Sequence, residues 1–185
     1  MRIVGGTRRG RRLLPPRSSG TRPTADRVRE SLFNVLGQTL AGGDVLDLYA
    51  GTGALGLEAL SRGAERAVLV DSATEASELC RKNTEALGFE GEVSVLRLRA
   101  ERAVERLERE GRRFVLVFAD PPYAARAGAW VVGAVAPLLL GGGTLVVEHD
   151  RREELPEASG VLLRVDQRRF GDTVLSFYRA TQPKP

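Results

Sequence analysis

The chain has 185 residues, of which 42% are hydrophobic and 28% charged, a formal net charge of +4 at pH 7, and a single cysteine, Cys80. One cysteine excludes an intramolecular disulfide, no apolar run reaches membrane-spanning length, and arginines stand where the apolar segment of a signal peptide would lie. We therefore expect a soluble, cytoplasmic protein whose length suffices for one sizeable core.

The N-terminal arm, residues 1–22, is strongly basic. Residues 1–24 contain seven arginines and no acidic residue, whereas the rest of the chain carries 21 basic and 24 acidic residues, a net charge of −3. This asymmetry is typical of a segment that binds a polyanion, with a solvated basic tail as the alternative. Ile3, Val4, Leu13 and Leu14, separated by glycine turns, predict a small β-hairpin. The candidate substrate contacts are Arg8, Arg9, Arg11, Arg12 and Arg22, since guanidinium groups bind phosphates in bidentate fashion.

A helix follows the proline-rich loop at Pro15–Gly20. Thr24 is expected as its N-cap, and Val28, Leu32 and Val35 recur at helical spacing. Ordinary capping is one role for Thr24, and a place beside a bound ligand is the other.

The next segment is read as strand, glycine turn and helix. The strand covers residues 44–48 and ends near Asp47, the turn has the pattern Gly51-x-Gly53-x-x-Gly56, and the helix runs to about Arg62. Glycine lets the chain reverse while its backbone stays open to a ligand, so we expect a cofactor cradle. The same spacing also fits the dinucleotide fingerprint, but the chain leaves little room for the substrate domain of such an enzyme.

Asp71 ends the second strand, residues 67–70. A carboxylate there can accept hydrogen bonds from both hydroxyls of a ribose, and it can also cap the following helix, residues 74–87. A third strand, residues 93–96, and a charged helix at about residues 101–110 continue the alternation of strands and helices.

The fourth strand, residues 114–119, leads into Asp120-Pro121-Pro122-Tyr123. The exocyclic amine of a base is a poor nucleophile because its lone pair is delocalised into the ring. The Asp120 carboxylate and the Pro121 carbonyl can each accept one N–H of such an amine, which directs the lone pair at an incoming group, while Pro122 stiffens the turn. Tyr123 offers a face on which an unstacked base can lie. An ordinary turn after a strand is the alternative.

The C-terminal part predicts an apolar helix at residues 130–140, broken near Pro137, and a fifth strand at residues 144–147. Two more strands, residues 161–165 and 173–178, are so close in sequence that they must form an antiparallel hairpin. His149 has no cysteine or histidine partner, which argues against a transition-metal site. The fold class is α/β: a Rossmann-like, doubly wound sheet of seven mostly parallel strands, with ligands at the carboxyl ends of the strands.

Two motifs together carry a family resemblance. The D-L-x-x-G-x-G loop at residues 47–53 and D-P-P-Y at residues 120–123 resemble the S-adenosyl-L-methionine-dependent methyltransferases of class I that act on exocyclic amines of bases. The stretches 2–13, 21–34 and 170–176 are similar to the RsmD family of bacterial 16S rRNA guanine-N2 methyltransferases. The resemblance implies a 16S rRNA substrate within the small subunit or an assembly intermediate, a monomer, and a methyltransferase domain at residues 23–185 behind an RNA-binding arm. It also implies a cofactor site formed by Asp47, Ala50, Gly51, Gly53, Asp71, Ala100 and Thr24.

One position departs from the pattern of such methyltransferases. An acidic residue often precedes the small residue after the third strand, but this chain has Arg99 before Ala100, which leaves the adenine contact to the Ala100 backbone or to Glu101. Two other functions fit parts of the sequence. A DNA adenine-N6 methyltransferase shares D-P-P-Y but usually needs a separate target-recognition region, and an RNA-binding assembly factor would keep the fold without turnover.

Overall fold

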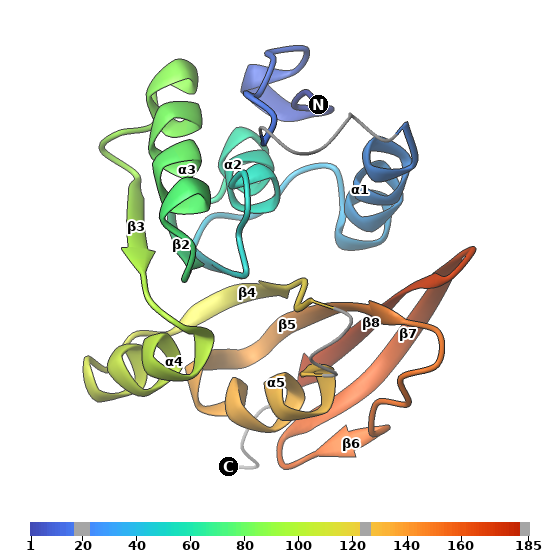
Figure 1. Ribbon diagram of the computed structural model, residues 1–185. Coiled ribbons are helices and arrows are strands. Elements are labelled where there is room, and N and C mark those ends of the chain that lie inside the picture. The colour runs from blue at the N-terminus through green and yellow to red at the C-terminus, as the bar shows by residue number, and fades with distance from the viewer. Residues whose placement is uncertain (17–22, 123–126, 182–185) are drawn as a thin grey trace. The chain divides into compact units, whose positions relative to one another are not determined.

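The computed structural model (Figure 1) describes residues 1–16, 23–122 and 127–181, which fall into two units, Met1–Ala100 and the residues from Glu101 onward. Each unit contains its own part of an α/β architecture. Among the described residues, no helix combines the length and the apolar character that crossing a membrane requires.

The first unit contains a three-stranded parallel sheet in the order β3-β2-β1, with Leu46 opposite Val68 and Leu69 opposite Val95. Val45, Leu46 and Leu48 of β1 are fully buried, as expected of parallel strands covered on both faces. Its elements are the short 3₁₀ helix η1 (Gly6–Arg8), α1 (Pro23–Leu36), β1 (Asp44–Leu48), α2 (Ala54–Ser61), β2 (Arg66–Asp71), α3 (Thr74–Leu87) and β3 (Val93–Arg97).

The arm belongs to this first unit and lies over one end of α2, next to α3 (Figure 1). Ile3 and Leu13 are buried, and the backbone N–H of Ile3 donates to the carbonyl of Arg11 at 2.9 Å. The predicted hairpin is reduced to one antiparallel bridge, Arg2 with Arg12, because η1 occupies part of the segment between them.

The second unit pairs β4 and β5 in parallel and then adds three antiparallel strands in the order β5-β8-β7-β6. Phe118, Leu145, Val147 and Phe177 form part of its buried core. Helix α5 lies against β5 (Figure 1). The elements are α4 (Ala100–Arg109), β4 (Phe114–Ala119), α5 (Gly128–Ala134), the 3₁₀ helix η3 (Ala136–Leu138), β5 (Leu139–Asp150), β6 (Ala158–Ser159), β7 (Leu162–Phe170) and β8 (Thr173–Ala180).

Most predicted elements are confirmed. The strands β1 and β4 and the helix α3 have the predicted bounds, and β7 and β8 form the predicted antiparallel hairpin. The described residues hold eight strands rather than seven, because the two-residue β6 adds to the edge of β7.

Two boundaries differ from prediction for local reasons. Strand β5 runs from Leu139 to Asp150, beyond the predicted residues 144–147, and includes the glycines at 141–143. Its pairing with β4 shifts there from Phe114–Leu139 to Leu116–Thr144. Helix α1 starts at Pro23, so Thr24 lies in its first turn and is not the N-cap. Proline suits the first helical position because its fixed φ is already helical and its missing N–H would have no partner there.

Candidate functional site

The glycine loop between β1 and α2 has an unusual backbone. Tyr49, Gly51 and Gly53 all have positive φ, of 64°, 56° and 77°, and Gly53 is the N-cap of α2. For a tyrosine this conformation costs of order 1 to 3 kcal/mol, so it persists only where its surroundings impose it, commonly at functional sites. The N–H of Ala50 donates to the carbonyl of Val70 at 2.9 Å and thereby holds the loop on β2.

The three glycines of the motif have different roles. A Cβ on Gly53 or Gly56 would lie 2.9 Å or 2.3 Å from the side chain of Leu69, so these two glycines let the loop and α2 pack closely on β2. A Cβ on Gly51 would meet nothing nearer than the carbonyl oxygen of Tyr49 at 4.0 Å. Gly51 is therefore the position where the bare backbone faces open space that a ligand can enter, which fits the predicted cradle.

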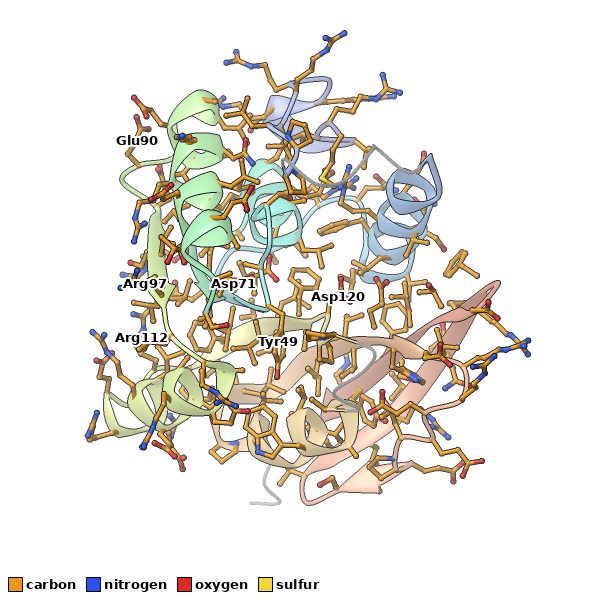
Figure 2. All side chains as sticks on the ribbon, viewed as in Figure 1. Tyr49, Asp71, Glu90, Arg97, Arg112 and Asp120 are labelled. Atoms are coloured by element: carbon orange, nitrogen blue, oxygen red, sulfur yellow. The ribbon has the colours of Figure 1, made fainter. Side chains whose placement is uncertain are left out.

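Asp71, at the end of β2, joins this loop to α3. One carboxylate oxygen accepts the N–H of Gly51 at 3.0 Å, and the other accepts the N–H of Ala73, the N-cap of α3, at 2.9 Å. Tyr49 and Asp71 are labelled in Figure 2 at this edge of the unit. Since a carboxylate oxygen has two lone pairs, each oxygen keeps one acceptor position for a hydroxyl of a bound ligand.

Asp47 lies beneath the loop and is buried, with 2% of its surface exposed. Its carboxylate accepts the N–H of Gly56 at 3.0 Å. Burial raises the pKa of Asp47 to about 7, the bond from Gly56 opposes that rise, and the negative charge of Asp71 adds to it. Near neutral pH both the neutral and the ionised form of this carboxyl are therefore populated, and a positive charge placed next to it would favour the ionised form.

Helix α3 supports the loop through two buried side chains, Cys80 and Asn83, for which the sequence predicted no contact with the loop. The thiol of Cys80 donates to the carbonyl of Gly51 at 3.4 Å, and the amide of Asn83 donates to the carbonyl of Thr52 at 2.9 Å. Their helical spacing with the apolar residues of α3 could have indicated this role, because a polar residue buried among apolar ones needs a specific partner.

A hollow of about 170 Å³ adjoins the loop. It lies between the glycine turn and the first turns of α3, so its position matches that of the predicted cradle. Its lining residues are Pro16, Gly51, Thr52, Ala73, Glu75, Ala76 and Leu79.

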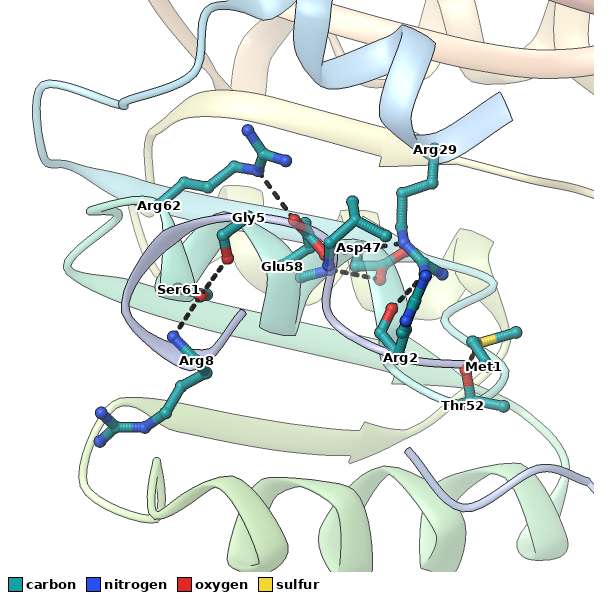
Figure 3. Close-up of polar contacts among 12 residues, drawn as sticks. Met1, Arg2, Gly5, Arg8, Arg29, Asp47, Thr52, Glu58, Ser61 and Arg62 are labelled. Atoms are coloured by element: carbon teal, nitrogen blue, oxygen red, sulfur yellow. Dashed lines mark hydrogen bonds and ion pairs between the residues drawn. The ribbon is translucent and has the colours of Figure 1, made fainter. Parts of the chain in front are cut away.

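A buried ion cluster fastens the arm to the unit (Figure 3). The carboxylate of Glu58 on α2 is fully buried, accepts the N–H of Val4 at 2.8 Å, and lies 2.8 Å from Nε of Arg62 and 3.6 Å from Nε of Arg29. Arg29 also donates to the carbonyl of Arg2. One acidic side chain thus connects the arm, α1 and α2.

The arginines of the arm fall into two groups. Arg8 donates to the carbonyl of Leu87 and Arg11 to that of Ala86, both at 2.8 Å, and the guanidinium of Arg8 lies 5.0 Å from the ring centre of Phe89. These two arginines satisfy carbonyls at the C-terminal end of α3. Arg9 and Arg12 are exposed on the arm, as is Arg11 despite its bond to Ala86.

In the second unit, Asp120 follows β4 directly and is exposed, Pro121 is buried, and Pro122 is exposed. Asp120 is labelled in Figure 2. His149 is buried in β5, where its Nε2 lies 2.9 Å from Oγ of Ser176, to which Gln167 donates at 3.0 Å. This network accounts for His149 as a core residue of the sheet.

The structure brings together five of the predicted cofactor contacts, at the carboxyl ends of β1 and β2: Asp47, Ala50, Gly51, Gly53 and Asp71. Ala100 is buried and is the first residue of α4, and Thr24 lies on α1. Tyr123 and Arg22 lie outside the described residues. A role for any of these residues in binding remains a prediction.

Comparison with known proteins gives consistent results. YlbH of Bacillus subtilis (strain 168) is 37% identical over 181 residues, which cover 97% of this chain and 98% of that protein. Ribosomal RNA small subunit methyltransferase D of Escherichia coli (strain K12) is 43% identical over 123 residues, 66% of this chain and 60% of that protein's length. The 16S rRNA N2 G1207 methyltransferase of T. thermophilus, solved in complex with AdoMet and guanosine, shares the fold, with a TM-score of 0.69 and 22% identity over 90% of this chain and 45% of that one.

These matches confirm the predicted Rossmann-like methyltransferase fold, with parallel strands followed by antiparallel C-terminal strands. A family model described as Conserved hypothetical protein 95 matches residues 1–179. The chain therefore belongs to that family, and the predicted membership of the RsmD family is confirmed.

Proposed function

We propose that this protein transfers a methyl group from S-adenosyl-L-methionine to the exocyclic N2 of a guanine in 16S rRNA. The observation that carries the proposal is the glycine loop held by Asp71, in which Gly51 leaves its backbone open beside a carboxylate with spare acceptor positions. The relatives add support, because one is a small-subunit rRNA methyltransferase and the structure of another contains AdoMet and guanosine.

The cofactor site is proposed to lie at the carboxyl ends of β1 and β2. When bound, S-adenosyl-L-methionine supplies an electrophilic methyl group on a positively charged sulfur. Asp71 would accept hydrogen bonds from the ribose hydroxyls, and the backbone of Ala50, Gly51 and Gly53 would line the approach. Asp47 would favour a positively charged cofactor, because a neighbouring cation stabilises its ionised form.

The amine would be held by the D-P-P-Y segment. Asp120 and the carbonyl of Pro121 would each accept one N–H from the guanine amine, so that its lone pair is directed at the methyl group. Positioning of this kind can lower a barrier by about 7 to 11 kcal/mol relative to free encounter. After transfer the amine loses one proton, to water or to a carboxylate. Tyr123 would stack on the base once it is unstacked from the RNA.

The arm is proposed to hold the RNA backbone, with the chain acting as a monomer in the cytoplasm on the small subunit or an assembly intermediate. Its exposed arginines would neutralise phosphates and make binding dependent on salt. The arm's attachment to α2 and α3 would place these charges at a fixed distance from the glycine loop.

The test is methyl transfer from labelled S-adenosyl-L-methionine to 16S RNA and to 30S particles that lack native modification, with nucleoside analysis of the product. We expect N2-methylguanosine, and we expect Asp120→Ala to reduce its formation by about 100-fold or more. Asp172→Ala, which removes an exposed aspartate from the β7–β8 turn, is the matched control and should retain activity. Label in adenine N6 of DNA, or binding of the cofactor without transfer to any nucleic acid, would refute the proposal.

A further inference from the structure

Asn83 occupies a position that a core helix normally gives to an apolar residue. It lies on α3 with none of its surface exposed, on the same stripe as Leu79, Cys80 and Leu87. Burying an amide is unfavourable unless its polar atoms find partners. A residue of this kind therefore indicates which groups the protein has to hold in place.

All three hydrogen bonds of the Asn83 side chain leave its own helix. Its Nδ2 donates to the carbonyl of Thr52 in the glycine loop at 2.9 Å and to the carbonyl of Leu14 in the arm at 3.3 Å. Its Oδ1 accepts the N–H of Leu14 at 2.7 Å. One side chain thus holds a residue of the loop and both backbone polar groups of a residue of the arm.

A second contact joins the same two segments. The hydroxyl of Thr52 donates to Sδ of Met1 at 3.5 Å, and the carbonyl of Met1 accepts the N–H of Leu13 at 3.1 Å. Figure 3 shows Met1 against Thr52. The arm is therefore connected to Thr52, next to Gly51, in two ways: directly through Met1, and through Asn83 from Leu14.

We infer that Asn83 is a positioning residue that couples the glycine loop, where the cofactor is proposed to bind, to the basic arm. A ligand that fixes the loop fixes Thr52 and Asn83, and through them the backbone at Leu14. Because such coupling is reciprocal, RNA bound to the arm must strengthen cofactor binding by the same factor by which the cofactor strengthens RNA binding. The inference rests on the proposed function only in naming the two ligands.

The first measurement uses the wild-type chain without RNA. S-adenosyl-L-homocysteine serves as the probe, and hydrogen exchange of the Leu14 N–H is followed by NMR with and without it. We expect the probe to slow this exchange by about fivefold or more, the lower end of typical coupling between sites. A probe that binds and leaves the exchange at Leu14 unchanged would overturn the inference and leave the proposed function intact. A probe that does not bind would overturn both.

The second measurement compares variants. Asn83→Leu keeps the number and branching of the side-chain heavy atoms, at a larger volume, and removes all three bonds. Asn83→Ser is a smaller replacement should the leucine variant not fold. Thr84→Val is the matched control, since Thr84 is the buried neighbour whose hydroxyl bonds only within α3, to the carbonyl of Cys80 at 2.8 Å. Each variant is checked for native circular dichroism and studied well below its Tm.

In the wild type and in Thr84→Val, we expect the probe to lower the Kd for a 16S rRNA fragment by about fivefold or more. In the Asn83 variants the probe should leave this Kd unchanged, even though each ligand still binds alone. If Asn83 had a merely structural role, its replacement would weaken the binding of both ligands but would leave the ratio of the RNA Kd without the probe to the RNA Kd with it unchanged. Retention of the full effect of the probe on RNA affinity in a folded Asn83 variant would therefore refute the inference.

Discussion

The buried carboxyl of Asp47 makes the stability of the folded chain depend on pH. Its pKa is raised to about 7 from the usual value of 3.8. Between these two values the folded chain binds more protons at Asp47 than the unfolded chain does. The contribution of this group to stability is therefore complete below about pH 4 and is lost as the pH rises through 7, roughly 4 kcal/mol in total.

Asp47→Asn should remove this dependence, because asparagine is neutral at every pH and keeps an oxygen for the N–H of Gly56. We expect the variant to have a higher free energy of unfolding than the wild type at pH 8, with the difference shrinking toward pH 4. Urea unfolding at several pH values measures it. Parallel pH profiles for the two proteins would show that Asp47 ionises in the folded chain as an exposed carboxyl does.

At the scale of the elements, the arm and α3 form one structural piece. The side chains of Arg8 and Arg11 donate to carbonyls at the end of α3, whereas Arg9 and Arg12 are exposed residues that take no part in those bonds. Some arginines of a basic segment can thus form hydrogen bonds that stabilise the fold of their own chain. The arginine pairs should therefore differ in what their removal changes.

Replacing both Arg9 and Arg12 by alanine should weaken RNA binding and reduce the slope of log K against log salt by about 0.7 for each lost phosphate contact. The same replacement of Arg8 and Arg11 should lower Tm instead, since two bonds to the end of α3 are lost, each worth about 1 kcal/mol. Arg102 and Arg106, exposed on α4 and paired with Glu105 and Glu110, provide a control of equal charge. Equal effects of both arm pairs on the salt slope would contradict this division.

The elements that sequence predicted best are those set by local pattern. The continuous apolar run of β4, the largely apolar β1 and the Gly88 stop of α3, with φ of 69°, fix the bounds of these elements without help from the rest of the chain. The glycine turn after β1 and the place of Asp71 at the end of β2 were predictable for the same reason, because both follow from the order of residues along the chain. The role of these residues in binding stays a prediction.

The parts that sequence did not reveal depend on contacts between distant segments. From its sequence position alone, Glu58 would be expected on the surface of α2, yet it is buried. Its partners are Val4 in the arm, Arg29 on α1 and Arg62, which lies one helical turn further along the chain. Asn83 likewise looks like one polar residue among several in α3 until Leu14 is seen beside it. Only the tertiary fold brings these partners together.

At the scale of the whole chain, ligand binding should appear as stability. A ligand that binds only the folded state at 100 times its Kd adds about 2.7 kcal/mol to the free energy of unfolding. For a chain of this size that corresponds to a rise in Tm of about 5 to 10 °C. The rise requires no RNA and no turnover.

We expect S-adenosyl-L-homocysteine to produce this rise in the Tm of the wild type, measured by differential scanning calorimetry. In Asp71→Ala most of the rise should be lost. Asp44→Ala is the comparison, because Asp44 stands at the opposite end of β1 and pairs with Arg66 at 2.9 Å. An equal rise in Asp71→Ala would show that the carboxylate at the end of β2 takes no part in binding.

The only cysteine of the chain gives the loop a reporter of its own. Cys80 is buried against Gly51, and burial raises the pKa of its thiol to about 12, so in the closed loop it offers almost no thiolate to an alkylating reagent. We therefore expect alkylation to require an opening of the structure around Cys80, through the loop or through the unit as a whole. The labelling rate of the unmodified protein should therefore report on such openings, with no engineered cysteine or attached dye.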